Sequence, residues 1–296
     1  MRHPKVIIVC GPTATGKSDL AVLLARRFKG EVVSADSRQV YRGLDVGSGK
    51  ITRREMNGVP HHLIDVCDPK KTYNVERFKN DGRKAIEDIL SRGDVPIICG
   101  GTGFYIDALA YDESFPAVPP DAKLRARLAK KSTKTLMKEI EKLDPRRAKE
   151  LDPLNKVRII RAIEIARVLG KVPKMKRTKA YETLWIGLTT DRKALREKIR
   201  ARLQRRMKQG MVEEAKSLRK RGLSWKRFHE LGLEYRFLAL YLQGKISKES
   251  MLLELENRIV DFSKRQMTWF QRNKDIHWLR PDQSGKALSL AKRFLS

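Results

Sequence analysis

Short apolar runs alternate with longer stretches of helical spacing through the first third of the chain. Three runs, at 6–10, 31–35 and 94–99, are mostly apolar, as strands covered on both faces of a parallel sheet are. Residues 75–92 instead repeat apolar side chains every three or four positions, which predicts an amphipathic helix. Strands that alternate with helices in this way predict an α/β fold, with a parallel sheet flanked by helices.

The pattern changes near residue 114. Three prolines between 116 and 120 predict a hinge, and the residues that follow are basic, with helical spacing and no strand-like run. Strand-like texture returns at 184–188, Leu-Trp-Ile-Gly-Leu. We therefore predict two domains, a core formed by residues 1–113 and 184–296 and a helical insertion formed by residues 114–183.

Two long helices are predicted in the C-terminal part, at 195–207 and 248–272. In the first, apolar side chains recur every four residues, and the other faces are dense with Arg and Lys. In the second, Arg258, Arg265 and Arg272 recur every seven residues and therefore share a face. Such a ridge fits a nucleic-acid backbone, but it could equally pair with Asp261 and with the phosphates of a small ligand.

An eight-residue motif separates the first predicted strand from the first predicted helix. Residues 11–18 read Gly-Pro-Thr-Ala-Thr-Gly-Lys-Ser, which matches the phosphate-binding P-loop, G-x-x-x-x-G-K-[ST], in its strand–loop–helix context. The helix that follows places Leu20, Leu23 and Leu24 on one side. A glycine turn that merely starts a helix is the alternative, but the Lys-Ser pair and both flanking elements favour the P-loop.

The residue types of this motif suit an anion. Gly11 and Gly16 permit backbone conformations in which successive N–H groups point at phosphate oxygens, and the helix N-terminus adds partial positive charge. Lys17 supplies a full positive charge, and the hydroxyl of Ser18 can bind Mg²⁺. The motif therefore predicts a P-loop NTPase-like fold that binds a phosphate-bearing ligand.

Three further loops carry candidate ligand-binding residues. Asp36 follows the second predicted strand and Thr102 a later one, and ligands of parallel sheets bind at the carboxyl ends of the strands. Asp36 is either a helix N-cap or a functional carboxylate, and we favour the latter. The Thr102 loop is either an ordinary turn or a phosphate contact. Residues 47–50, Gly-Ser-Gly-Lys, offer either a second basic contact or a mobile loop.

The charge of the chain points to a polyanionic partner. It carries 65 Lys and Arg against 35 Asp and Glu, a formal net charge of +30, and basic side chains that approach a polyanion release its counterions. Nucleic acid is the favoured partner, and an acidic membrane surface or a thermophile's charged exterior are the alternatives. No apolar stretch is long enough to span a bilayer. The cysteines Cys10, Cys67 and Cys99 lack metal-ligand spacing, which indicates buried, reduced thiols in a cytoplasmic protein.

Taken together, the motifs resemble the tRNA dimethylallyltransferase (isopentenyltransferase) family, over most of the chain. Only the P-loop is specific by itself, but a nucleotide kinase would share the P-loop and little else. The segments that carry the resemblance are GPTATGKS (11–18), SADSRQVYRGLDVG (34–47), HHLID (61–65), VPIICGGTGFYI (95–106), VRIIRAIEI (157–165) and KRQMTWF (264–270).

The resemblance implies a tRNA-modifying enzyme that acts in the cytoplasm as a monomer and does not bind a membrane. With Mg²⁺, it would transfer a dimethylallyl group from dimethylallyl diphosphate to N6 of adenosine 37 in tRNA and release diphosphate. The implied catalytic residues are Asp36 as the base, with Thr102 and Lys17 polarising the leaving group. The implied diphosphate-binding residues are Gly11, Pro12, Thr13, Ala14, Thr15, Gly16, Lys17 and Ser18, with Ser18 as the metal ligand. The implied tRNA contacts are Asp36, Ser37, Arg38, Gln39, Arg125, Val157, Arg158, Ile159, Ile160, Arg161, Lys264 and Arg265.

The sequence departs from the family pattern in the C-terminal half. Residues 234–237 read Glu-Tyr-Arg-Phe where the family usually has Gly-Tyr-Lys-Glu. Residues 259–266 read Ile-Val-Asp-Phe-Ser-Lys-Arg-Gln where it has Thr-Arg-x-Tyr-Ala-Lys-Arg-Gln, so the first arginine of that pattern is missing. Arg258, close to the vacated position, is the replacement that we consider. Three rival functions stay open: an adenylate isopentenyltransferase acting on free AMP, ADP or ATP, a P-loop small-molecule kinase, and a catalytically silent RNA-binding protein.

Overall fold

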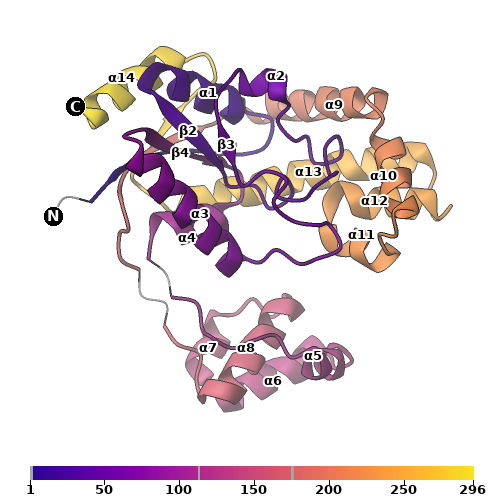
Figure 1. The fold of residues 1–296 in the computed structure, drawn as a ribbon. Helices are drawn as coiled ribbons and strands as arrows, with labels where there is room; N and C mark the ends of the chain where they lie inside the picture. The colour runs from indigo at the N-terminus through magenta and orange to yellow at the C-terminus, as the bar shows by residue number, and fades with distance from the viewer. Residues whose placement is uncertain (1–2, 113, 175–176) are drawn as a thin grey trace. The chain divides into compact units, whose positions relative to one another are not determined.

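The chain folds into two compact units, Met1–Tyr111 with Lys179–Ser296, and Asp112–Thr178. The computed structural model describes residues 3–112, 114–174 and 177–296, and Figure 1 draws the chain from end to end. The sequence analysis placed the helical insertion at 114–183. The predicted C-terminal boundary, 183, lies a few residues beyond the end of the smaller unit at Thr178.

The larger unit is built on a six-stranded sheet in the order β3-β2-β4-β1-β5-β6. Every pairing is parallel, with Ile7 of the central strand β1 opposite Ile97 of β4 and Leu184 of β5. The predicted α/β fold with a parallel sheet is confirmed. The strands are β1 Lys5–Cys10, β2 Gly30–Ser34, β3 His61–His62, β4 Val95–Gly100, β5 Glu182–Leu188 and β6 Ile276–Leu279.

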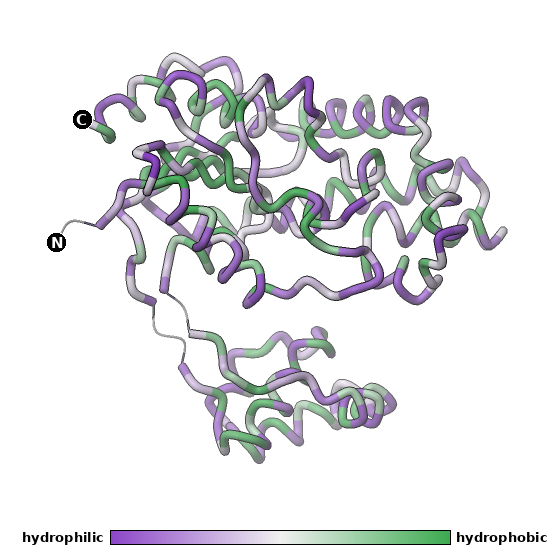
Figure 2. Tube along the Cα trace, in the orientation of Figure 1, coloured by the Kyte–Doolittle hydropathy of each residue, from purple (hydrophilic) through white to green (hydrophobic). Residues whose placement is uncertain are grey.

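Two hydrophobic clusters cover the two faces of this sheet. Because successive side chains of a strand point to opposite faces, Val6 and Ile8 of β1 join one cluster, and Ile7 and Val9 join the other. The central strands are correspondingly hydrophobic in Figure 2. Among the helices of this unit, α1 and α14 pack on the second cluster, and α3, α4 and α13 pack on the first.

The helices of the larger unit mostly begin where the sequence offers a cap or a glycine. Asn74 caps α3, Asp191 caps α9 and Ser247 caps α13, each through a side-chain oxygen that accepts a backbone N–H. The helices are α1 Lys17–Phe28, α2 Arg53–Met56, α3 Val75–Ser91, α4 Gly103–Ala110, α9 Arg192–Lys208, α10 Met211–Lys220, α11 Trp225–Leu231, α12 Leu233–Leu242, α13 Lys248–Phe270 and α14 Ser284–Leu295.

One predicted core position was wrong. Leu23 was placed on the buried side of α1, yet it is 39% exposed. The buried side of the helix is formed by Leu20, Ala21, Val22, Leu24 and Ala25, so it is displaced around the helix away from position 23.

The three cysteines are free and buried, as predicted. Burial raises the pKa of the Cys99 thiol to about 12 and raises that of Cys10 further, so both stay protonated at neutral pH. Across the described residues, no helix is long and apolar enough to cross a membrane.

In the described part of the smaller unit, four helices surround a core of their own, which includes Leu128, Leu136, Ile140 and Ile163. Each helix has a side-chain N-cap, supplied by Asp121, Ser132, Asp144 and Asn155. The helices are α5 Ala122–Ala129, α6 Thr133–Leu143, α7 Pro145–Glu150 and α8 Lys156–Leu169.

Helix α8 does not begin at the pair Asp152-Pro153 that precedes it. The pair Asp152-Pro153 has helix-start character, but Asp152 Oδ1 accepts a hydrogen bond from the backbone of Leu154 within a turn, at 2.9 Å. The helix begins instead at Lys156, where Asn155 Oδ1 accepts the backbone N–H of Arg158 at 3.2 Å.

Candidate functional site

The P-loop joins β1 to α1 at the carboxyl end of the central strand. Gly11 has φ +133°, and a Cβ there would lie 2.3 Å from the carbonyl oxygen of Leu188, so this position requires glycine. Thr15 Oγ1 donates to the carbonyl of Pro12 at 2.9 Å, which holds the loop in a closed turn. The N–H groups at the N-terminus of α1 therefore lie at the carboxyl edge of the sheet.

Lys17 is the cation of this loop, and it is largely shielded from water. Burial lowers the pKa of Lys17 to about 8, and the positive charge of Arg202 adds to the shift, whereas Asp36 opposes it. Its Nζ donates to the carbonyl of Pro12. A cation whose charged form is disfavoured in this way is stabilised when an anion arrives beside it.

Gln266 of α13 connects the P-loop to the loop after β4. Its Oε1 accepts the backbone N–H of Thr13 at 2.9 Å, and its Nε2 donates to the carbonyl of Gly101 at 2.8 Å. The sequence analysis assigned Gln266 no role. A buried amide on the apolar side of a long helix was the available signal, because a buried polar group needs partners.

Asp36 lies just beyond the end of β2 and performs two tasks. Oδ1 accepts the backbone N–H groups of Arg38 at 2.8 Å and Gln39 at 3.3 Å, so it caps a turn over residues 37–40. The N-cap alternative was therefore correct in kind, although the capped element is a turn and not a helix. Oδ2 makes no hydrogen bond to the described residues, and the half-buried carboxylate lines the cleft next to Lys17.

Thr102 connects the ends of β2 and β4. Its Oγ1 accepts the backbone N–H of Ser37 at 3.2 Å, and its own N–H donates to the carbonyl of Ala35 at 3.2 Å. Since the hydroxyl acts as acceptor to Ser37, its proton is available to a ligand oxygen. The structure thus brings Asp36 and Thr102, two of the three predicted catalytic residues, to one sheet edge with Lys17.

Arg202 of α9 completes the cleft, and the sequence analysis missed it. Its guanidinium donates to Thr13 Oγ1 and to the carbonyl of Gly49, both at 3.1 Å. Burial lowers the pKa of Arg202 to about 10, and the neighbouring charge of Arg206 adds to the shift. The residues that line the cleft are Thr13, Lys17, Ser18, Val32, Ser34, Asp36, Gln39, Ile51, His61, Cys99, Gly100, Gly101, Arg202, Phe262 and Gln266.

The side chain of Lys50 is bonded to groups of the protein, although its segment was one candidate for a basic phosphate contact. Its Nζ donates to the carbonyl of Tyr41 at 2.9 Å and pairs with the carboxylates of Asp45 and Asp65. The basic residue of the Gly-Ser-Gly-Lys segment therefore stabilises its own loop.

The predicted tRNA contacts of the larger unit fall in two places. Arg38 and Gln39 lie in the turn that Asp36 caps, beside the cleft. Lys264 and Arg265 are exposed on α13, where Lys264 pairs with Asp261 at 3.2 Å and Arg265 lies over the ring of Phe262, 5.8 Å from its centroid.

The predicted contacts of the helical unit differ in exposure. Val157 is 78% exposed and Arg158 also faces solvent, but Ile159 and Ile160 are 0% and 8% exposed within the core. A direct ligand contact from this segment therefore falls to Val157, Arg158 and Arg161, which leaves the two isoleucines in a packing role.

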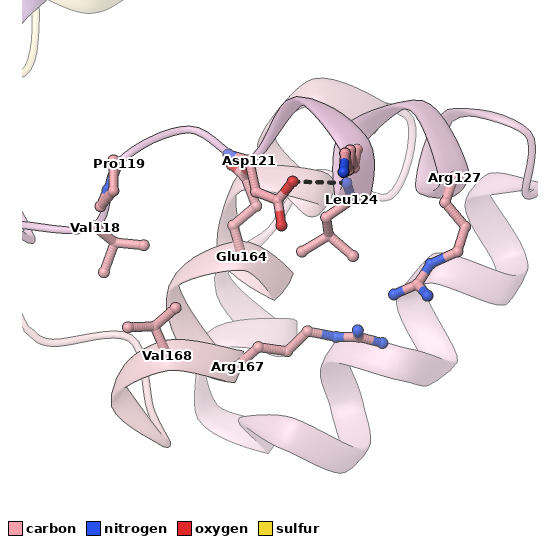
Figure 3. Close-up of a pocket in the computed structure, with 9 residues that line it drawn as sticks. Val118, Pro119, Asp121, Leu124, Arg127, Glu164, Arg167 and Val168 are labelled. Carbon is pink, nitrogen blue, oxygen red and sulfur yellow. Dashed lines mark hydrogen bonds between the residues drawn. The ribbon is translucent and has the colours of Figure 1, made fainter.

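Arg125 is held by a buried carboxylate. Its Nε and Nη2 donate to the two oxygens of Glu164, each at 2.7 Å, and Glu164 also accepts the backbone N–H of Asp121 and the guanidinium of Arg161. A pocket lies over this cluster, with Val118, Leu124 and Val168 as apolar walls. Figure 3 shows the side chains of Arg127 and Arg167 extending toward the same hollow.

Two family models match the chain: IPP transferase over residues 39–273 and Isopentenyl transferase over residues 4–69. The "tRNA dimethylallyltransferase 2" of Treponema denticola is 47% identical over 272 residues, which cover 90% of this chain and 91% of that protein. The "tRNA dimethylallyltransferase" of Pelotomaculum thermopropionicum is 38% identical over 295 residues, with coverage of 97% and 94%.

Two solved structures are similar to the whole chain. The full-length tRNA isopentenylpyrophosphate transferase from Bacillus halodurans superposes with a TM-score of 0.74 at 32% identity, covering 98% of both chains. A eukaryotic dimethylallyltransferase, described as acting on tRNA, superposes with a TM-score of 0.86 at 25% identity, covering 99% of this chain and 79% of that one.

Proposed function

The chain belongs to the tRNA dimethylallyltransferase (IPP transferase) family, and from this membership we propose its reaction in detail. The enzyme transfers a dimethylallyl group from dimethylallyl diphosphate to N6 of adenosine 37 in tRNA, giving N6-isopentenyladenosine and diphosphate. The observation that carries the proposal is the cleft at the sheet edge, where the carboxylate of Asp36 lies beside two cations, Lys17 of the P-loop and Arg202 of α9. Burial disfavours the charged form of both cations.

The donor's diphosphate suits the P-loop side of this cleft. The N–H groups at the start of α1 and the cations of Lys17 and Arg202 offer an anion more positive charge than the carboxylate of Asp36 offsets. A diphosphate that pairs with the ammonium of Lys17 offsets the cost of burying that charge. These groups also stabilise the negative charge that develops on the leaving group as the carbon–oxygen bond breaks.

Mg²⁺ fits the same cleft. It prefers oxygen ligands and keeps several waters, and the Ser18 hydroxyl supplies an oxygen there. Within the described residues no group of three or more His, Cys, Asp or Glu side chains converges on a metal site, which favours an ion held mainly by the donor's phosphates. When bound, Mg²⁺ would neutralise charge on the departing diphosphate.

Asp36 is the proton acceptor in this proposal. The bond between C1 of the allyl group and the diphosphate oxygen breaks, the bond between N6 and C1 forms, and the N6 proton passes to Asp36 Oδ2. Oδ1 stays bonded to the 37–40 turn and fixes the carboxylate while Oδ2 reacts. Thr102 donates a hydrogen bond from its hydroxyl to the diphosphate, and the adenine must leave its stack to enter the cleft.

The basic side chains that contact the tRNA in this proposal are exposed or half-buried. Arg38, Arg158 and Arg161, together with Lys264 and Arg265, are the contacts we propose, and a net charge of +30 supplies the long-range attraction. Arg125 acts by holding Glu164. We propose a monomer, which light scattering of the purified protein tests.

Labelled dimethylallyl diphosphate, Mg²⁺ and either bulk tRNA or AMP test the proposal. Nucleoside analysis after digestion is expected to find the label on N6-isopentenyladenosine from tRNA only. Label recovered on AMP would instead establish an adenylate isopentenyltransferase. We favour tRNA because a mononucleotide acceptor would need neither the large positive charge of the chain nor its helical unit.

A further inference from the structure

The loop between β2 and α2 is fastened to helix α10 by one carboxylate. Glu214 Oε2 accepts the backbone N–H groups of Asp45 at 2.7 Å and Val46 at 2.6 Å, and Oε1 accepts that of Gly47 at 3.0 Å. The hydroxyl of Tyr235, from α12, donates to the same Oε1 at 2.9 Å. Hydrogen bonds to an ionised acceptor are stronger than neutral ones, so a single side chain sets the position of three consecutive residues.

The loop is also closely packed by the helices behind it. Tyr235 is fully buried. Arg206 is buried as well, donates to Glu234 at 3.1 Å and lies 3.5 Å from the carbonyl of Gly47. Gly49 has φ +61°, and a Cβ there would lie 1.8 Å from Arg206 Nη2. The mobile-loop alternative for residues 47–50 is therefore wrong in this structure.

The fastened loop leads directly to the cleft. The carbonyl of Gly49 accepts a hydrogen bond from Arg202 Nη2, and the other end of the same guanidinium donates to Thr13 Oγ1 of the P-loop. Arginine has a long side chain with many rotamers, and these two oxygens select the one that faces the cleft. The position of Gly49 in turn depends on the residues that Glu214 holds.

We propose that Glu214 is a positioning residue for the donor's diphosphate: it fixes the 45–49 loop, so that the Gly49 carbonyl holds the Arg202 guanidinium against the P-loop. This inference rests on the proposed function, since it supposes that the cleft binds diphosphate. Glu214 itself lies on α10, outside the set of residues that line the cleft.

The first test is calorimetry of the full chain with inorganic diphosphate and Mg²⁺. Glu214→Gln keeps the shape of the side chain but turns an N–H₂ donor toward the N–H groups of the loop. We expect about a tenfold weaker diphosphate Kd, with the Kd for an anticodon stem-loop unchanged. Glu213→Gln is the matched control, because it removes the same charge from an exposed neighbour on α10, and its diphosphate Kd should equal that of the wild type.

A double-mutant cycle decides whether Glu214 acts through Arg202. If it does, Glu214→Gln weakens diphosphate binding in the wild type but adds nothing in an Arg202→Ala background. Losses that add would overturn the inference, because a general destabilisation of the cleft is additive, and so would an unchanged Kd in Glu214→Gln. Failure of the wild type itself to bind diphosphate is a different result and overturns the proposed function as well.

A milder variant keeps the cycle decisive if Glu214→Gln does not fold, which circular dichroism would reveal. Tyr235→Phe removes only the hydroxyl that donates to Glu214 Oε1. It should raise the diphosphate Kd less than Glu214→Gln does, and again only when Arg202 is present. A Kd equal to that of the wild type would then count against the inference.

Discussion

At the scale of single residues, Asp36 illustrates why an alanine substitution would test two roles at once. Its Oδ1 caps the 37–40 turn, while Oδ2 faces the cleft. Asp36→Asn keeps an oxygen for the turn and removes the proton acceptor. We expect turnover to fall by about 10²–10⁴-fold, with stem-loop affinity nearly intact, in single-turnover kinetics and a binding titration. Unchanged turnover would remove Asp36 from the base role.

Lys17 predicts a pH dependence of donor binding. Its pKa in the free protein is lowered to about 8, and a bound diphosphate favours the charged form, so the pKa rises in the complex. Binding therefore takes up a proton above pH 8, and the Kd should weaken by about tenfold per pH unit there but stay flat below. Calorimetry across pH 6.5–9.5 measures the slope.

Lys17→Arg is the control, because its guanidinium stays protonated over that range while the ligand's own titration is common to both proteins. In the variant, the weakening of the diphosphate Kd above pH 8 that is due to Lys17 should disappear. A wild-type profile that parallels the variant's would show that Lys17 does not titrate with diphosphate binding.

Residue-level prediction succeeded where the local sequence implies a position in space. Lys17, Asp36 and Thr102 each follow an apolar run, and the ends of parallel strands meet at one edge. Arg202 and Gln266 could not be found in this way. Arg202 is one of many basic residues on α9, and Gln266 contacts Thr13 across 253 positions of the chain, so only the packed fold reveals which side chains reach the cleft.

At the scale of elements, Glu164 is a buried carboxylate that joins α5 to α8 in the helical unit. Burial alone would raise the pKa of Glu164. Hydrogen bonds from Arg125 and from the backbone of Asp121 nevertheless hold this pKa below its usual value. A carboxylate with a depressed folded pKa stabilises the fold above its unfolded pKa and loses that contribution as the pH falls through the folded pKa.

Glu164→Gln should therefore destabilise the helical unit by about 1–3 kcal/mol at pH 7, and the difference from the wild type should shrink below about pH 4, near the usual pKa of a glutamate. Hydrogen exchange of the α5 and α8 amides in the full chain measures this loss of stability. Glu141→Gln, at an exposed position of α6, should leave exchange unchanged. Equal protection in the wild type and Glu164→Gln would contradict the role of the cluster.

Element prediction worked where an apolar pattern was long or continuous. The strands β1, β2, β4 and β5 and the helices α3, α9 and α13 were recognised because burial on both sides of a sheet, or along one side of a helix, leaves a clear period. Strand β6, Ile-His-Trp-Leu, was missed. It has four residues, an exposed His277 and only β5 as a neighbour, so its pattern resembles that of a loop.

At the scale of the whole molecule, charge is the property that the sequence determines without a fold. The net charge of +30 indicates a polyanionic partner, and the family named by the comparisons acts on tRNA. Charge alone could not show where the partner lies, because basic residues occur on almost every helix, many of them paired within the protein, as Arg196 and Arg200 are with Glu256.

Salt dependence separates a polymer acceptor from a mononucleotide and locates part of the contact. The anticodon stem-loop Kd should weaken steeply between 50 and 200 mM salt, by about 10³-fold or more if six or more phosphates are contacted. Lys264→Ala and Arg265→Ala should each lower the log–log slope by about one. Lys292→Ala is the control, because it removes an exposed charge from α14, which packs on the opposite face of the sheet from α13. Its slope should match that of the wild type. A flat salt response in the wild type would favour a mononucleotide acceptor, whereas equal slopes in all four proteins would move the tRNA contact away from this part of α13.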